Sequence, residues 1–255
     1  MAEPSPRQQA FTIMSREPSP KQKPPAYDRR GLNVFDPNDL SGLKSEFITQ
    51  VQQRVLRQHL PRARPGDVSV DVGCGYGRHA GFLAELGYRT IGVDPDPALL
   101  EYARGAYPNA EFRQGQMPDL PIEPGSVRLI GVFNVLRALH LMGELRVFDG
   151  LGRFLSPDGT LAVIENMRPD HPRYVAEESL LRWANGEGLV LAERLPFRVG
   201  RRWYLYPMML GLYPKAALQH TVEREIARTL ALRRAPAGTY LNVLFLFRKA
   251  ASDAG

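Results

Sequence analysis

Three glycines at every second position, Gly73, Gly75 and Gly77, follow an apolar run in "VSVDVGCGYGR" (residues 68–78). Glycine lets a backbone approach a ligand without a Cβ clash, so this turn is typical of a nucleotide-binding loop. A dinucleotide fingerprint, G-x-G-x-x-G, needs its third glycine at the position where this chain has Arg78. A P-loop would need Gly-Lys-Ser/Thr, which does not follow. The pattern therefore disfavours ligands that bind through a pyrophosphate.

Two acidic residues indicate a cationic nucleoside instead. Asp71 lies two positions before Gly73, where its carboxylate would repel a pyrophosphate and attract a cation. Asp94 lies about 20 residues after the first glycine, the usual place for an acid that hydrogen-bonds ribose hydroxyls. A ribose, a positive charge and no phosphate fit S-adenosylmethionine, which we expect as the cofactor.

Alternating strands and helices would position these residues. A helix-spaced apolar pattern from Leu43 to Leu60 precedes them. The sequence then predicts strands at 68–73, 89–94, 110–115, 126–136 and 160–166, and helices at 79–87, 97–107 and 143–155. Asp96 is placed to cap the helix at 97–107. This order predicts a mostly parallel sheet covered on both faces, with the ligand at the carboxyl ends of the strands.

The second half of the chain is less regular. We expect a helix at 175–188, a strand at 189–195 and a last strand at 240–249. Between the strands, residues 196–239 show no strand alternation, and only 221–232 is predicted as helix. We expect 196–239 to be a substrate lid whose aromatic, Met and Arg side chains bind the acceptor. A dimer face, a helical core or contact with anionic lipid are the alternatives.

Four segments together resemble the successive motifs of class I S-adenosylmethionine-dependent methyltransferases. They are "VDVGCGYGR" (70–78), "IGVDPDPALLEYAR" (91–104), "EFRQGQMPDLPIEPGSVRLIGVFNVLRALH" (111–140) and "RFLSPDGTLAVIE" (153–165). The resemblance implies an α/β, Rossmann-like, doubly wound seven-stranded sheet with a reversed last strand, here with a helical insert between the last two strands. We expect a disordered Pro-rich tail (1–30) and a single methyltransferase domain (31–255).

The same resemblance assigns the cofactor-binding positions. They are Asp71, Gly73, Gly75, Gly77, Asp94, Pro95, Gln116, Met117 and Asn134. The first four would line the methionine end, and Asp94 would hold the ribose. Pro95 and Met117 would lie near the adenine, with core packing as the alternative for Met117. Gln116 replaces the acid that the family often has opposite the adenine amino group. Asn134 would lie near the methyl group or the methionine moiety.

A general base is needed only when the acceptor atom carries a proton that must leave. His140 follows the fourth predicted strand and His171 the fifth, so both are candidate catalytic bases at the cofactor edge. Glu165 and Asp170 are alternatives near the same edge. The segment "ENMRPDH" (165–171) is a weak ligand set for a metal-dependent transfer, and we expect no metal.

Composition narrows the class of protein. The chain has 255 residues, a net charge of +6, one cysteine and no apolar run long enough to span a membrane. Because Cys74 is the single cysteine, an internal disulfide is excluded. We expect Cys74 to be a small buried residue rather than a nucleophile. Without a signal-peptide pattern we expect a cytoplasmic protein, monomeric or homodimeric. The charge without an RNA-binding motif gives no support for sequence-specific nucleic-acid binding.

The acceptor is predicted from two further segments. "NVFDPNDLSGLKSEFITQVQQ" (33–53) and "YLNVLFLFRK" (240–249) resemble bacterial methyltransferases of surface-glycan or secondary-metabolite pathways. The resemblance implies O-methylation of a hydroxyl on a small molecule of that kind. The alternatives are an RNA or protein methyltransferase, and a non-catalytic cofactor-binding protein that pairs with a partner.

Overall fold

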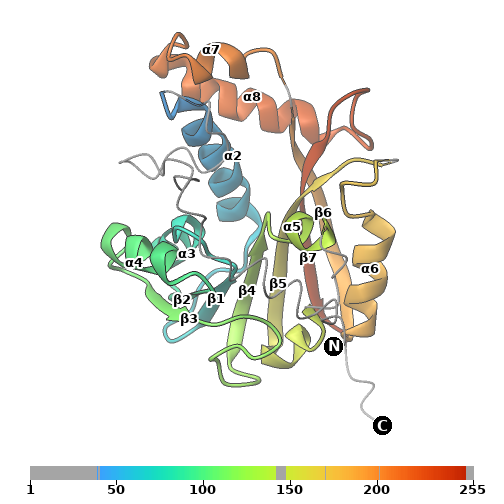
Figure 1. Cartoon of the computed structure of the whole chain (residues 1–255). Helices are drawn as coiled ribbons and strands as arrows, with labels where there is room; N and C mark the ends of the chain where they lie inside the picture. The colour runs from blue at the N-terminus through green and yellow to red at the C-terminus, as the bar shows by residue number, and fades with distance from the viewer. Residues whose placement is uncertain (1–38, 40, 142–147, 170, 201, 251–255) are drawn as a thin grey trace, which may run out of the picture. The chain divides into compact units, whose positions relative to one another are not determined.

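The computed structural model describes residues 39, 41–141, 148–169, 171–200 and 202–250 (Figure 1). The predicted tail at 1–30 and the candidate base Asp170 lie outside these residues. The chain divides into two compact units, residues 1–49 with 203–218 and residues 50–202 with 219–255.

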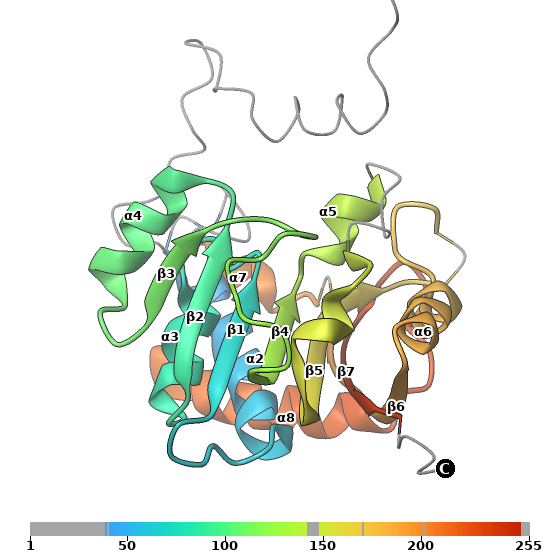
Figure 2. The same ribbon diagram turned by 90° about the horizontal axis from the view of Figure 1, so that it is seen from below.

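Seven strands of the larger unit form one sheet in the order β3-β2-β1-β4-β5-β7-β6 (Figure 2). Their bounds are β1 Val68–Val72, β2 Arg89–Asp94, β3 Glu111–Gln114, β4 Val127–Phe133, β5 Leu155–Met167, β6 Leu189–Val199 and β7 Leu241–Lys249. The pairs β1–β2, β1–β4, β2–β3 and β4–β5 are parallel, whereas β7 is antiparallel to both β5 and β6. The predicted doubly wound sheet with a reversed last strand is confirmed.

The central strands β1 and β4 are apolar along their length and buried, as expected for parallel strands covered on both faces. Val70 and Val72 of β1 share a core cluster with Ile130 and Val132 of β4. The strand order reverses between these two strands, because β1 leads outward to β2 and β3 while β4 leads the other way. Their carboxyl ends are therefore the topological switch point, where ligands of such sheets bind.

The described part of the chain also forms helices and short 3₁₀ turns. They are α2 Leu43–His59, α3 Arg78–Glu85, α4 Pro97–Ala106, α5 Leu136–Leu141, η2 Leu151–Phe154, α6 Glu177–Gly186, α7 Leu205–Met209, η3 Lys215–Ala217 and α8 Leu218–Leu230. Helix α3 packs on β1 and β2, α4 on β2 and β3, and α6 on β6 (Figure 1). Asp96 caps α4 as predicted, accepting from the backbone N–H of Ala98 at 2.8 Å. Among the described residues, no helix has the length and apolar character needed to cross a bilayer.

Two predicted boundaries are wrong. Strand β6 continues to Val199, so residues 196–199 belong to the sheet and not to the insert. Pairing with β7 overrides the local signal there, and a register shift between Pro196 and Arg198 accommodates the proline. Strand β5 begins at Leu155, opposite Val127, although "SPDG" reads as a turn. Within the predicted helix at 143–155, η2 is a 3₁₀ turn, and residues 143–147 lie outside the described ones.

The smaller unit joins the first turn of α2 to α7. The Phe47 and Tyr204 rings meet edge to face, with centroids 5.7 Å apart. The Ser41 hydroxyl donates to the Met208 carbonyl at 2.6 Å. Large apolar side chains of this unit are exposed, namely Trp203, Tyr206, Leu210 and Leu212. A lid, a dimer face and a lipid contact all fit such a surface, so the role of this part of the insert stays a prediction.

Candidate functional site

The glycine loop after β1 has a left-handed backbone at each glycine, with φ of 72° at Gly73, 51° at Gly75 and 78° at Gly77. Side chains with a Cβ rarely adopt this conformation, which explains the residue type at these positions. The Val93 carbonyl of β2 accepts from the N–H groups of Gly73 at 2.8 Å and Cys74 at 3.1 Å. These bonds fix the loop at the carboxyl ends of β1 and β2.

The three glycines serve different purposes. A Cβ on Gly75 would meet nothing within 4 Å, so this backbone borders open space. A Cβ on Gly73 would lie 2.8 Å from the Val135 side chain. A Cβ on Gly77 would lie 2.7 Å from Phe112 and clash with α4 as well. Gly77 thus allows close packing of α4 and β3, and Gly75 is the glycine best placed to face a ligand.

Asp94 at the end of β2 is held by two backbone bonds. Its Oδ2 accepts from Gly75 N–H at 2.9 Å, and its Oδ1 accepts from Asp96 N–H at 3.0 Å. Burial raises the pKa of Asp94, and these two N–H groups oppose the rise. Each carboxylate oxygen still has a lone pair to accept from a further donor. Since Asp96 caps α4, Asp94 is not that cap and remains placed for a ribose.

Asp71 lies inside the sheet and is almost fully buried. Burial raises the pKa of this carboxyl to about 7, while the charge of Arg78 and a bond from the Ala80 N–H lower it. Burial also lowers the pKa of Arg78 to about 10. These interactions join Asp71 to the first turn of α3, which supports a role in shaping the loop. Its predicted role toward the methionine end stays a prediction.

The residues predicted to lie near the adenine differ in how exposed they are. Gln116 is exposed, whereas Met117 is buried and belongs to the main core cluster with Leu120. Pro95 is half-buried, and its carbonyl accepts from the Gln114 Nε2 at 3.1 Å. Gln114, the last residue of β3, was not predicted as a site residue. Its position at the end of a strand was the signal that could have indicated it.

Asn134, directly after β4, is the non-glycine residue with a positive φ, 61°, in the described part of the chain. Its N–H donates to the Ile164 carbonyl of β5 at 2.7 Å. Its side-chain Nδ2 is buried and has no hydrogen-bond partner among the described residues. A strained backbone and a buried donor without an acceptor both mark functional positions. The switch point thus carries an open backbone at Gly75, an acceptor at Asp94 and a spare donor at Asn134.

The two candidate bases, His140 and His171, lie near each other. His140 Nε2 is 3.0 Å from the carbonyl oxygen of Pro172, the residue after His171. His171 Nδ1 accepts from the Arg173 N–H at 3.3 Å, and its ring meets Tyr174 edge to face. Sequence segments 31 residues apart are therefore brought to the same edge of the sheet, as predicted from the strand ends.

Glu165 is fully buried at the end of β5. It accepts from the backbone N–H of Arg137 at 3.0 Å and of Asn166 at 2.8 Å. Burial raises its pKa to about 7 against these bonds and the charge of Arg137. Because both oxygens are occupied by backbone, the geometry supports a role in fixing the start of α5, which carries His140.

Cys74 packs in a cluster with Ala80, Leu100 and Phe112, and burial raises its thiol pKa. The buried thiol therefore has little thiolate character, which supports the packing role. Within the residues that the structure describes, no group of three His, Cys, Asp or Glu side chains is arranged to hold a metal ion.

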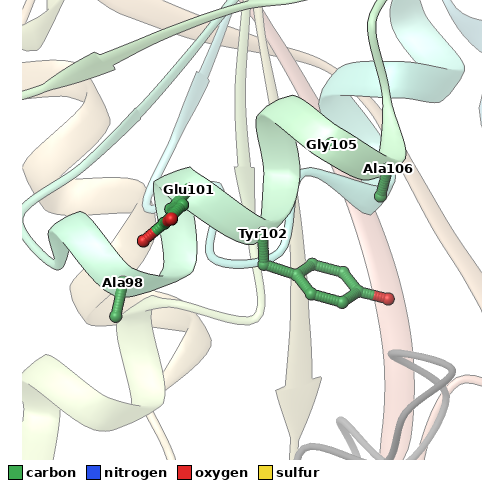
Figure 3. A pocket seen from close by; sticks show the side chains of 5 residues that line it. All are labelled: Ala98, Glu101, Tyr102, Gly105 and Ala106. Atoms are coloured by element: carbon green, nitrogen blue, oxygen red, sulfur yellow. The ribbon is translucent and has the colours of Figure 1, made fainter.

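A hollow of about 570 Å³ lies on one face of α4 (Figure 3). Its described lining comes from α4 itself, namely Ala98, Glu101, Tyr102, Gly105 and Ala106. No predicted site residue is among them. The Tyr102 ring meets the Tyr76 ring of the glycine loop edge to face at 5.4 Å. This hollow is distinct from the switch point.

Sequence reasoning missed a set of polar side chains at the opposite part of the same edge. We call them the edge cluster: Arg137, Tyr174, Arg198, Tyr240 and Asn242. Arg198 and Asn242 are almost fully buried in β6 and β7. The signal was a single polar residue inside each of the apolar runs "PFRV" and "YLNVLFLF". Their partners are far apart in sequence, so only the fold brings them together.

Comparison with known proteins follows this geometry. Residues 70–159 match the model of a family described as a methyltransferase domain. A probable S-adenosylmethionine-dependent methyltransferase of Mycolicibacterium smegmatis is 30% identical over 124 residues, 49% of this chain and 48% of the relative. An uncharacterized methyltransferase of Synechocystis is 30% identical over 107 residues, 42% of this chain and 50% of the relative. The chain thus spans about half the length of these relatives.

Solved structures share the fold. A geranyl diphosphate C-methyltransferase from Streptomyces coelicolor, solved with S-adenosyl-L-homocysteine, has a TM-score of 0.57 at 20% identity, covering 88% of this chain and 85% of that one. A TehB-like methyltransferase from Corynebacterium glutamicum has a TM-score of 0.52 at 21% identity, covering 79% and 88%. At these identities the likeness extends to the fold alone.

Proposed function

Because residues 70–159 match the model of a family described as a methyltransferase domain, we propose that the protein is an S-adenosylmethionine-dependent methyltransferase that methylates a hydroxyl of a small-molecule acceptor. The acceptor class that we propose is a secondary metabolite or a glycan-like molecule. The observation that carries the proposal is the switch point, where Gly75, Asp94 and Asn134 offer open space, an acceptor and a spare donor.

These residues fit S-adenosylmethionine chemically. Asp94 would accept from the ribose hydroxyls, because it is a fixed carboxylate at the end of β2. Asn134 would donate its free Nδ2 hydrogens to the carboxylate of the methionine moiety. The backbone at Gly75 would lie against the ligand, since no Cβ stands in the way. When bound, this cofactor supplies a methyl group on a sulfonium, which is already a good leaving group.

The chain's own contribution to transfer would be alignment and removal of the hydroxyl proton. His140 Nε2 faces the Pro172 carbonyl, which can only accept, so in the neutral ring Nε2 carries the hydrogen. Nδ1 of His140 then keeps its lone pair and is the atom that would take the proton. His171 uses its Nδ1 lone pair for the Arg173 N–H, so its remaining nitrogen is protonated. His140 is therefore the better base of the two.

Two experiments test the proposal in order. Isothermal titration calorimetry with S-adenosylhomocysteine should give saturable 1:1 binding; no binding would contradict the proposed function at its base. Transfer is then followed as S-adenosylhomocysteine release from S-adenosylmethionine over a panel of phenols, sugars and matched O-methylated compounds. Turnover with hydroxyl compounds alone is expected. Turnover with RNA or a protein, and none with the panel, would favour the RNA or protein methyltransferase alternative. Cofactor binding without turnover of any tested acceptor would favour the non-catalytic alternative.

The base assignment has its own variant pair. His140→Gln should lower kcat by about 10²–10⁴-fold, because a positioned base contributes that much. S-adenosylhomocysteine affinity should be unchanged. His171→Gln is the matched control and should stay within about threefold of the parent rate. The reverse ranking would make His171 the base.

A further inference from the structure

The edge cluster runs across three neighbouring strand ends. Asn166 of β5 is paired directly with Asn242 of β7, and Asn242 is paired directly with Arg198 of β6. Directly paired residues project from the same face of a sheet, so the three side chains form one row. Arg198 Nε donates to Asn242 Oδ1 at 2.5 Å, and Asn242 Nδ2 donates to Asn166 Oδ1.

Two tyrosines connect this row to α5. The Arg198 guanidinium lies 5.6 Å from the centre of the Tyr240 ring, and its Nη2 donates to the Tyr240 hydroxyl at 3.2 Å. The Tyr240 and Tyr174 rings lie 5.9 Å apart. The Arg137 guanidinium lies 5.0 Å from the centre of the Tyr174 ring. Each arginine thus packs on one of two neighbouring tyrosine rings.

The arginines of this edge have more buried donors than acceptors. Arg198 is 3% exposed, yet its Nη1 has no hydrogen-bond partner among the described residues. The Nε atoms of Arg137 and Arg202 are also buried and have no hydrogen-bond partner among these residues. A buried guanidinium N–H without an acceptor is costly, and native structures rarely tolerate it without a ligand, ion or water. Donors of this planar kind match the two oxygens of a carboxylate or phosphate.

The net charge around these arginines is also suited to an anion. The acids facing these arginines are Glu165, bonded to the Arg137 N–H, and Glu225, whose Oε2 lies 3.8 Å from Arg202 Nε. Glu225 Oε1 is already occupied by the Val199 N–H at 2.6 Å. Among the described residues named here, the three guanidiniums of Arg137, Arg198 and Arg202 outnumber the two carboxylates of Glu165 and Glu225. Arg137 and Tyr240 are half-buried, so the cluster reaches the surface on their side.

We propose that the edge cluster is the acceptor-binding subsite and that it binds a carboxylate or phosphate group carried by the acceptor, with the tyrosine rings against the adjoining apolar part. This inference rests on the proposed methyl transfer. Arg137 lies three residues after Asn134, so the subsite continues the same sheet edge from the cofactor site. Arg198 and Arg137 set the specificity for an anionic acceptor.

Titration calorimetry of the full chain saturated with S-adenosylhomocysteine tests the subsite. The probes are benzoate, its neutral analogue benzamide, and inorganic phosphate. Benzoate or phosphate should bind, and benzamide should not; the stronger of the two anions identifies the group. Arg198→Gln and Arg137→Gln should each weaken the binding anion by about tenfold or more, because each removes a charged donor from a buried site.

Arg194→Gln is the matched control. Arg194 also lies on β6, but its donors are paired with Glu177 at 2.6 and 2.9 Å, so its loss should leave anion affinity within about twofold. The inference is overturned if neither anion binds or if benzamide binds as well as benzoate. It is also overturned if the arginine variants bind the anion like the parent, because water alone would then serve the spare donors. Affinity for S-adenosylhomocysteine is measured for every variant, and its absence in the parent would instead defeat the proposed function.

If Arg198→Gln does not fold, as judged by circular dichroism, Arg137→Gln and Arg198→Lys carry the test. Lysine keeps the charge but lacks the planar fork, so about a tenfold loss is still expected. Parental affinity in both would refute the subsite.

Discussion

The two ends of the candidate ligand-binding edge of the sheet are built from different chemical groups. On the β1–β2 side, the candidate cofactor site consists largely of backbone: left-handed glycines, the Gly75 N–H and one carboxylate that holds it. On the β5–β7 side, the edge cluster consists of side chains from α5, the segment before α6, and the ends of two strands. In the first site Gly73 and Asp94 are 21 positions apart and Asn134 lies 40 positions further on, whereas residues of the second site are up to 105 positions apart, Arg137 to Asn242.

This difference indicates which changes each region tolerates. A backbone site fails when a side chain intrudes on it, because its geometry depends on the absence of Cβ atoms. A side-chain site fails when one partner of a buried network is removed, because the remaining polar groups are left without bonds. We therefore expect glycine substitutions to dominate on the first side, and substitutions of buried polar residues to dominate on the second.

The largest effect is expected for Gly75→Val. The β-branched side chain would fill the open space beside the loop and is strained at φ 51°. S-adenosylhomocysteine affinity in calorimetry should fall by about 1,000-fold, or about 4 kcal/mol. Gly66→Val is the control, since Gly66 has φ 87° and open space but lies before β1, at the opposite edge. Equal affinity losses in the two variants would mean that strain, and not the ligand cradle, explains the result.

The next effect concerns the buried carboxyl that holds α5. Glu165 has a folded pKa of about 7, above its ordinary value of 4.5. The folded protein therefore binds the extra proton, and the stability present below pH 4.5 is lost as the pH rises through 7, by about 3 kcal/mol. Glu165→Gln should remove this part of the pH dependence of the unfolding free energy, measured by denaturant titration. Asp71 shifts in the same direction but is present in both proteins. Parallel curves for variant and parent would refute the assignment.

A smaller effect is expected for Asp94→Asn. The amide keeps one acceptor but presents an NH₂ group to either the Gly75 or the Asp96 N–H, so the loop and the ribose contact are both weakened. S-adenosylhomocysteine affinity should fall by about 10- to 100-fold, the range for a charged hydrogen bond. Asp96→Asn should leave affinity unchanged, because asparagine caps α4 as well as aspartate does. A similar loss in both variants would assign the effect to α4.

The accuracy of the sequence predictions follows from the range of the interactions. Strands β1 to β4 were predicted to within a few residues, because buried parallel strands give continuous apolar runs. The end of β6 at Val199 was missed, because its pairing with Leu241 of β7 outweighs the local signal of Pro196. The glycine loop and Asp94 were predicted from spacing, and the structure places Asp94 against the loop through the Gly75 N–H, while its role toward a ribose stays a prediction. Arg198 was missed, since an arginine inside a strand shows no partner until β7 lies beside it.

The sequence by itself predicted the cofactor class and the order of strands and helices, because glycines and acids at strand ends and the apolar periods are signals that can be read along the chain. Only the tertiary structure showed that a Cβ on Gly77 would clash with α4 and β3, that Glu165 bonds to the start of α5, and that Arg137 and Arg198 pack on two neighbouring tyrosine rings. These relations depend on which strand ends and loops become neighbours. That is a property of the folded sheet, whose order β4-β5-β7-β6 brings distant residues to one edge.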